Sequence, residues 1–237
     1  MTAPTKSQVN KAGRRLRKWM IEPQQELNGL DQAFEVFYAF RAAHQYPLTK
    51  ALNGVRSMVT TAGCTAQVSS RLKRAWTILD KLRREPTMQL ANMEDIGGVR
   101  AIVGNLEELR RAERRIKKIR TPQRIRDYIE EPRMSGYRGV HLTVRYDDRA
   151  GNERAIEVQL RTPVMHEWAI AVERLSGRMG ADLKGGQGPQ PVLDLLEAIS
   201  EATALEERGE PVENDLLERM RQLREVALPL MAGGAQP

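Results

Sequence analysis

The spacing of apolar residues changes near the middle of the chain from a helical period to a strand-like one, and this change constrains the fold more than any other feature. Five segments alternate or run apolar as strands do, three of them clearly and two weakly: 98–103, 139–146 and 154–161, then 65–70 and 124–129. The turn-forming residues of 147–153 predict a hairpin between two of these strands. We therefore expect an α+β fold with a mixed β-sheet of about five strands flanked by helices.

Helical spacing dominates the rest of the 237 residues. Helices are expected over the segments 7–19, 23–44, 47–60, 72–84, 106–120 and 163–177, with two more after the glycine-rich stretch 185–191. This order divides the chain into an N-terminal helical segment (1–64), a core that holds the sheet (65–178) and acidic C-terminal helices (179–237).

Charge and cysteine content exclude several classes of protein. Lys and Arg number 38 against 31 Asp and Glu, a net charge of +7, which favours partners that carry negative charge. A single cysteine, Cys64, excludes a disulfide framework and a cysteine-ligated zinc site. No apolar stretch approaches the roughly 20 residues of a membrane span, and no secretory signal is recognisable. We expect a cytoplasmic protein with no membrane partner.

The positive charge is concentrated in one expected helix. Within 110–120, seven residues are Lys or Arg and one is Glu, whereas 194–225 holds ten acids against four Arg. Leu106, Leu109 and Ile116 recur at helical spacing through the basic run, which indicates an amphipathic helix with a basic outer face. That face has two interpretations, a solvated surface or a contact with phosphates or nucleic acid, and the sequence leaves both open.

Alternation gathers polar side chains on one face of the expected sheet. They comprise a carboxylate, an amide, an imidazole, a hydroxyl and two guanidinium groups: Glu157, Gln159, His141, Thr143, Arg145 and Arg161. A solvated sheet face is the ordinary explanation of such a pattern. A carboxylate among several anion-binding side chains favours instead a site for charged substrates.

Residues on either side of the first strands suggest phosphate and metal binding. Lys73, Lys81 and Arg84 share one face of the expected helix 72–84 and could line a polyphosphate, although neither glycine-rich phosphate-binding pattern is present. Asp95 precedes a strand, where an acid is often only a turn residue. Paired with Glu157, it would supply hard oxygen ligands for Mg²⁺, completed by substrate phosphates.

Four blocks of sequence, in order, resemble the RelA/SpoT synthetase domain. They lie within 68–173 and include Asp95-Ile-Gly-Gly-Val-Arg100, Ser135-Gly-Tyr-Arg-Gly-Val-His141 and Ile156-Glu-Val-Gln-Leu-Arg-Thr162. The flanking segments resemble those of the small stand-alone alarmone synthetases. The resemblance implies a nucleotidyltransferase-like synthetase fold without a hydrolase domain. It also implies a Mg²⁺-dependent transfer of pyrophosphate from ATP to the 3′-hydroxyl of GDP or GTP, which makes the (p)ppGpp alarmones.

The resemblance also implies a function for individual residues. Those that would hold ATP are basic: Arg71 and Arg100, which stack on adenine, and Lys73, Lys81 and Arg84, which bind phosphates. Asp95 and Glu157 would ligate Mg²⁺, and Glu157 would help to deprotonate the acceptor. His141 and Gln159 would complete the catalytic group. The residues that would bind the acceptor are Tyr137, which stacks on its base, and Arg133, Arg161 and His166.

Some positions depart from the usual pattern of the family. Gly139 replaces a common serine, and the segments 168–174 and 183–188 are similar to a branch that includes toxins of toxin–antitoxin pairs. That similarity implies an alternative acceptor, the 3′ CCA end of tRNA or an adenosine nucleotide, with a block of translation and an antitoxin protein as partner. A catalytically inactive, nucleotide-binding regulator is a third hypothesis, and a homo-oligomer is compatible with all three.

Overall fold

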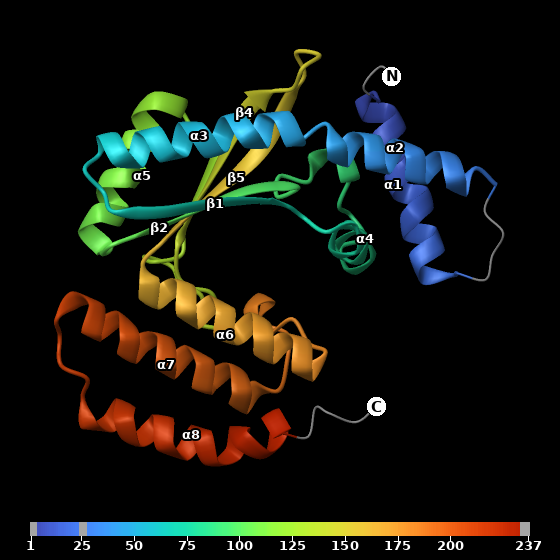
Figure 1. Cartoon of the computed structure of the whole chain (residues 1–237). Coiled ribbons are helices and arrows are strands. Elements are labelled where there is room, and N and C mark those ends of the chain that lie inside the picture. The colour runs from blue at the N-terminus through green and yellow to red at the C-terminus, as the bar shows by residue number, and fades with distance from the viewer. Residues whose placement is uncertain (1–3, 24–27, 233–237) are drawn as a thin grey trace.

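The computed structural model describes residues 4–23 and 28–232 (Figure 1). Its helices are α1 (Lys6–Ile21), α2 (Leu30–Ala42), α3 (Gln45–Thr61), α4 (Ala75–Arg84), α5 (Leu106–Arg120), α6 (Pro163–Met179), α7 (Gln190–Arg208) and α8 (Asn214–Ala232), with short 3₁₀ turns η1 (Leu90–Asn92) and η2 (Leu183–Gly185). Its strands are β1 (Ala66–Leu72), β2 (Gly97–Val103), β3 (Arg124–Asp127), β4 (Val140–Asp147) and β5 (Glu153–Arg161). The expected α+β class is confirmed.

The five strands form one mixed sheet in the order β1-β2-β5-β4-β3. Strands β2 and β5 run parallel, and the other three pairs of neighbouring strands are antiparallel. The expected hairpin joins β4 to β5 through 148–152, where the Asp148 carboxylate accepts hydrogen bonds from the backbone N–H groups of Ala150 and Asn152. This topology places β5, which carries Glu157, at the centre of the sheet.

Helices α3 and α5 cover the apolar face of the sheet (Figure 1). Leu48, Ala51 and Val55 of α3, and Leu109 and Ile116 of α5, belong to the same buried cluster as the apolar side chains of the strands. Because α3 contributes to this cluster, the core of the sheet extends into the N-terminal helical segment. The other face of the sheet is therefore the one left for polar side chains.

Two further clusters surround the sheet. Helices α1, α2 and α4 bury a second apolar core. Helices α6, α7 and α8 lie side by side and bury a third (Figure 1). No helix of the described residues is long and apolar enough to cross a membrane.

Two helix starts differ from the expectation. Helix α2 begins at Leu30 rather than at Pro23, and residues 24–27 lie outside the described residues. Helix α4 begins at Ala75 rather than at Leu72, because β1 continues to Leu72 and the N–H of Lys73 donates to the carbonyl of Ile96 (2.8 Å). Lys73 is therefore not a helix residue. Trp76 of α4 is 64% exposed, although helical spacing places it on the side of Leu79 and Leu82, which are buried.

A buried histidine between α2 and α3 predicts a pH-dependent stability. His44 is 2% exposed, and its Nδ1 contacts the carbonyl oxygen of Phe40 at 2.9 Å. The pKa of His44 is lowered to about 4, mainly by burial and in part by the charge of Arg154. The Phe40 carbonyl and Asp148 oppose this shift. Since this value lies below that of an unfolded histidine, the contribution to stability is complete above pH 6.5 and is lost as the pH falls towards 4.

We expect this effect in denaturant unfolding at pH 7.5 and pH 4.5. Between these conditions the wild type should lose about 2 kcal/mol more of its free energy of unfolding than His44→Asn, which keeps a donor for the Phe40 carbonyl. An equal loss in both proteins would show that other groups account for the acid sensitivity.

Candidate active site

The register of the strands brings the predicted polar residues onto one face. Glu157 lies beside Gly98 of β2 and Thr143 of β4, and Gln159 lies beside Arg100 and His141. Cross-strand partners point to the same side of a sheet, so the alternation expected from the sequence holds across three strands. The outer strand β3 extends this face, because Arg124 pairs with Thr143 and Arg126 with His141.

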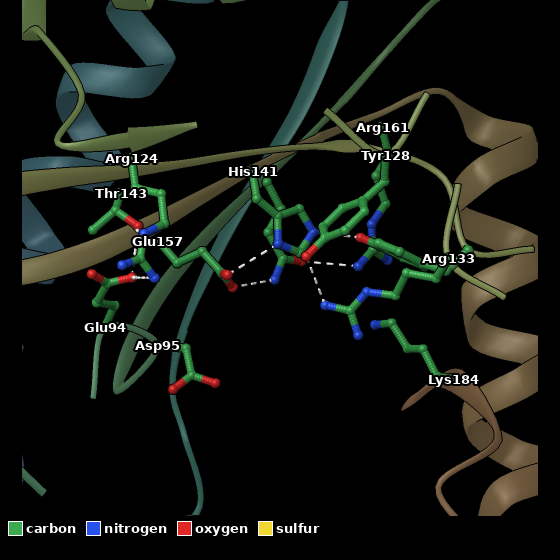
Figure 2. A network of polar contacts seen from close by, with 12 residues as sticks. Glu94, Asp95, Arg124, Tyr128, Arg133, His141, Thr143, Glu157, Arg161 and Lys184 are labelled. Atoms are coloured by element: carbon green, nitrogen blue, oxygen red, sulfur yellow. Dashed lines mark hydrogen bonds and ion pairs between the residues drawn. The ribbon is translucent and has the colours of Figure 1, made fainter. Parts of the chain in front are cut away.

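Glu157 is held by a hydrogen-bonded chain (Figure 2). Its Oε1 contacts Nδ1 of His141 at 3.0 Å, and its Oε2 accepts from the amide of Gln159 at 2.5 Å. Burial alone would raise the pKa of Glu157, but the hydrogen bonds from His141 and Gln159 outweigh it and lower the pKa to about 2. Burial lowers the pKa of His141, which favours the neutral imidazole. Glu157 is thus a fixed carboxylate that stays ionised at neutral pH.

Asp95 lies in the turn before β2, where two lysines meet it. Nζ of Lys73 is 2.5 Å and Nζ of Lys81 is 3.1 Å from Oδ2 of Asp95. Burial alone would raise the pKa of Asp95, but the two ammonium groups lower it. The other oxygen, Oδ1, is buried and has no hydrogen-bond partner among the described residues. A buried carboxylate oxygen in this state is suited to a cation or to a hydroxyl donor.

The predicted row of phosphate-binding cations is only partly brought together. Lys73 and Lys81 converge on Asp95, although Lys73 reaches it from the turn after β1 and not from the helix. Arg84, at the end of α4, instead contacts Asp80 at 2.9 Å and Asp182 at 3.1 Å. All three cations are therefore paired with acids, so a polyphosphate would have to compete for them.

The two arginines implied to stack on adenine lie on neighbouring strands. Arg71 belongs to β1 and Arg100 to β2, and both line a hollow of about 100 Å³ that also touches Gln159. Burial and the nearby charges of Arg161 and Arg71 lower the pKa of Arg100. Nε of Arg100 is buried without a hydrogen-bond partner among the described residues. The hollow is thus lined by two guanidinium groups at one edge of the polar face.

Tyr137, implied to be the platform for the acceptor base, has no open ring face in this structure. Its side chain is fully buried, and its hydroxyl contacts Nε2 of His141 at 2.6 Å. The Lys184 ammonium lies 4.6 Å from the ring centroid, and the guanidinium groups of Arg161 and Arg133 lie 5.2 and 5.5 Å from it. A base can stack on this ring only after one of these cations moves.

The remaining predicted acceptor residues lie around the same tyrosine. Arg161 is 1% exposed and donates to Gln159 at 2.9 Å, and Arg133 also covers the ring of Tyr128 at 4.6 Å. Burial, followed by the charges of Arg100 and Arg161, lowers the pKa of His166, which places it among these guanidinium groups. The structure therefore groups Arg133 and Arg161 around Tyr137 and places His166 near Arg161.

A cavity of about 850 Å³ opens from the two carboxylates towards the outer strands. Its walls hold four acids, Glu94, Asp95, Glu153 and Glu157, and seven Lys or Arg side chains: Lys6, Lys81, Arg124, Arg126, Arg133, Arg145 and Arg154. Arg124 and Arg126 were not predicted as site residues, although the alternation of β3 places them on the polar face. Lys184 was also missed, because its position over Tyr137 depends on a turn that no local pattern indicates.

The basic helix lies away from this cavity. Helix α5 packs on the apolar face of the sheet, which is opposite to the face that carries Glu157. Part of its charge is neutralised, since Arg110 contacts Glu113, Asp127 and Glu130, and Lys117 contacts Glu113. Arg114 and Lys118 are exposed. These contacts and exposures support the interpretation of the basic face of α5 as a solvated surface.

Comparison with known proteins identifies the central part of the chain. Residues 70–174 match the region found in RelA and SpoT proteins. The GTP pyrophosphokinase YjbM of Bacillus subtilis is 31% identical over 144 residues, which cover 58% of this chain and 66% of YjbM. The GTP pyrophosphokinase rsh of Brucella ovis is 32% identical over 112 residues, which cover 45% of this chain and 14% of that protein.

A solved structure extends the similarity to most of the fold. Small alarmone synthetase 1 from Bacillus subtilis, in a crystal structure bound to its product pppGpp, is 25% identical, with a TM-score of 0.64 over 81% of this chain and 99% of that one. The chain thus covers nearly all of this solved structure but at most about two thirds of the two curated relatives. The matched region and the fold together show that residues 70–174 are a RelA/SpoT domain and that the chain is a homologue of the small alarmone synthetases.

Proposed function

We propose that the chain is an ATP-dependent pyrophosphokinase that transfers pyrophosphate to the 3′-hydroxyl of GDP or GTP and so makes (p)ppGpp. The observation that supports this most is the convergence of Asp95, Lys73 and Lys81 beside Glu157 at one end of a large basic cavity. Transfer between polyphosphates requires positioned cations and metal-binding carboxylates, and little covalent chemistry from the protein. The family membership agrees with this reaction class.

The carboxylates fit Mg²⁺. Oδ1 of Asp95 is a hard oxygen ligand with no hydrogen-bond partner in the part of the chain that the structure describes, and Glu157 stays ionised because its pKa is low. When bound, Mg²⁺ would neutralise charge on the transferred phosphates. Asp95 and Glu157 would hold the ion, and Lys73 and Lys81, which lie beside Asp95, would bind donor phosphates.

In the proposed transfer, the 3′ oxygen of the acceptor attacks the β-phosphorus of ATP. A bond forms between these two atoms, the bond from the β-phosphorus to the α–β bridging oxygen breaks, and AMP leaves with that oxygen. The hydroxyl proton passes to the carboxylate of Glu157. A carboxylate with a pKa of about 2 is a weak base, so this proton moves late, after the new bond has made the hydroxyl strongly acidic.

The decisive experiment is a transfer assay with γ-³²P-labelled ATP and Mg²⁺. GDP, GTP, AMP and deacylated tRNA are supplied separately as acceptors, and the position of the label is determined after separation. We expect label on GDP and GTP. Label on AMP alone, or on tRNA alone, would agree with the proposed ATP site but would contradict a guanosine nucleotide as the acceptor. No transfer to any acceptor, with ATP still bound, would favour the inactive regulator.

Neutralising the basic helix should separate a nucleotide acceptor from tRNA. The suggested variant replaces Arg114, Arg115 and Lys118 of α5 with Gln and leaves Lys117 in place, because Lys117 pairs with the buried Glu113. A free nucleotide is held inside the cavity, so transfer to GDP should stay within about threefold of wild type. Under the alternative in which tRNA is the acceptor, binding would depend on many phosphate contacts, so transfer to tRNA and its dependence on salt would both fall steeply. Loss of GDP transfer would contradict the proposed cavity.

A further inference from the structure

The loop that precedes β4 packs closely against α7. Gly136 has a φ of +80°, and a Cβ at this position would lie 2.8 Å from Cβ of Ser200 and 2.9 Å from Cα of Glu197. The hydroxyl of Ser200 also donates to the carbonyl of Gly136 at 2.5 Å. Only a glycine permits this approach, so the contact between loop and helix is a close backbone contact.

Arg138, two residues after Gly136, is anchored on the same helix. Arg138 is 6% exposed, donates to the hydroxyls of Ser200 and Thr203 at 3.2 Å each, and forms an ion pair with Glu207 at 2.7 Å. The side chain of Glu207 is 9% exposed and also accepts from the hydroxyl of Thr162, which caps α6 after β5. A buried ion pair with its remaining groups hydrogen-bonded fixes geometry more than it adds stability.

This anchored loop carries the residues of the acceptor side. Tyr137 lies between Gly136 and Arg138, and its hydroxyl contacts His141, which in turn contacts Glu157. A shift of the loop would therefore change the position of both the tyrosine and the histidine. The anchoring residues of α7 lie beyond residue 174, where the match to the RelA/SpoT region ends.

We infer that α7 contributes to the acceptor site. Its residues Glu207 and Ser200 are positioning residues that hold the loop 135–139 in place for the acceptor. The inference rests on the proposed function for its kinetic consequence. In this proposal both residues act through Gly136 and Arg138. Among the described residues, no hydrogen bond or ion pair joins Lys73, Lys81 or Asp95 of the donor side to Ser200, Arg138 or Glu207.

The test is Glu207→Gln, with Glu206→Gln as matched control, since Glu206 is the exposed neighbour on the same helix. Gln keeps the size of the side chain and removes the charge that pairs with Arg138. We expect KM for the acceptor to rise about tenfold and KM for ATP to stay within twofold, as for the loss of one charged, buried contact. The control should match wild type. Equal changes in both KM values, or none, would overturn the positioning role.

A second variant reaches the same contact by another route. Gly136→Ala should push the loop from α7, and combining it with Glu207→Gln should add no further rise in acceptor KM, because both changes release the same loop. Hydrogen exchange of the backbone amides of 135–139 gives a readout that needs no activity, and it should accelerate in both variants. Accelerated exchange in an enzyme without transfer activity would refute the proposed function alone. Unchanged exchange would refute the anchoring.

Discussion

Replacing Glu157 with Gln, or Asp95 with Asn, is expected to reduce transfer by at least about a hundredfold, because each change removes a negatively charged oxygen ligand at the reacting phosphates. Glu157→Gln also brings an amide N–H₂ towards the donors of His141 and Gln159. Asp95→Asn leaves the ammonium groups of Lys73 and Lys81 without their common counter-charge. The measurement is steady-state turnover with ATP and GDP at saturating Mg²⁺.

The matched control for both variants is Asp147→Asn, an exposed acid at the end of β4. It should turn over like wild type, and all three proteins should unfold cooperatively, so that a loss of activity cannot be a loss of fold. Turnover of Glu157→Gln within tenfold of wild type would contradict the assignment of Glu157 as a metal ligand and leave the fold assignment intact. The same result for Asp95→Asn would shift the metal site away from the lysine pair.

The sheet and its polar face could be predicted because both depend on the period of the backbone. Side chains alternate along a strand whatever the tertiary contacts are, so Glu157, Gln159 and His141 had to share a face once β4 and β5 were paired. The same rule would have placed Arg124 and Arg126 in the site. They were missed because a four-residue edge strand gives only a weak alternation signal.

The partners of the charged residues could not be predicted in this way. Arg84 contacts Asp182, which lies 98 positions away in the sequence. Arg138, in the loop before β4, contacts Glu207 of α7. Helical spacing placed Lys73 on the face of Lys81, but the strand before it extended to Leu72 and changed the element on which Lys73 lies. Tertiary packing determines each of these contacts, and the local helix or strand propensity of a segment does not indicate them.

The burial of Tyr137 makes its substitutions informative about two properties. Tyr137→Ala should lower the free energy of unfolding by about 3–5 kcal/mol, because the ring fills a fully buried position in the cluster shared with Trp168 and Leu196. Denaturant unfolding measures this directly. A kinetic defect of this variant alone would therefore say little about the acceptor.

Tyr137→Phe and Tyr137→Leu separate stacking from packing. Lys184, the nearest cation over the ring, is held by one ion pair with Glu173 at 3.3 Å, and it would have to move for an acceptor base to stack there. Phe keeps the ring face and should leave KM for GDP within about threefold. Leu keeps most of the volume without the ring and should raise that KM about tenfold or more, since one stacked base contributes about 1–3 kcal/mol. KM for ATP should not change in either protein, and a rise confined to ATP would mean that the donor and acceptor sides are reversed.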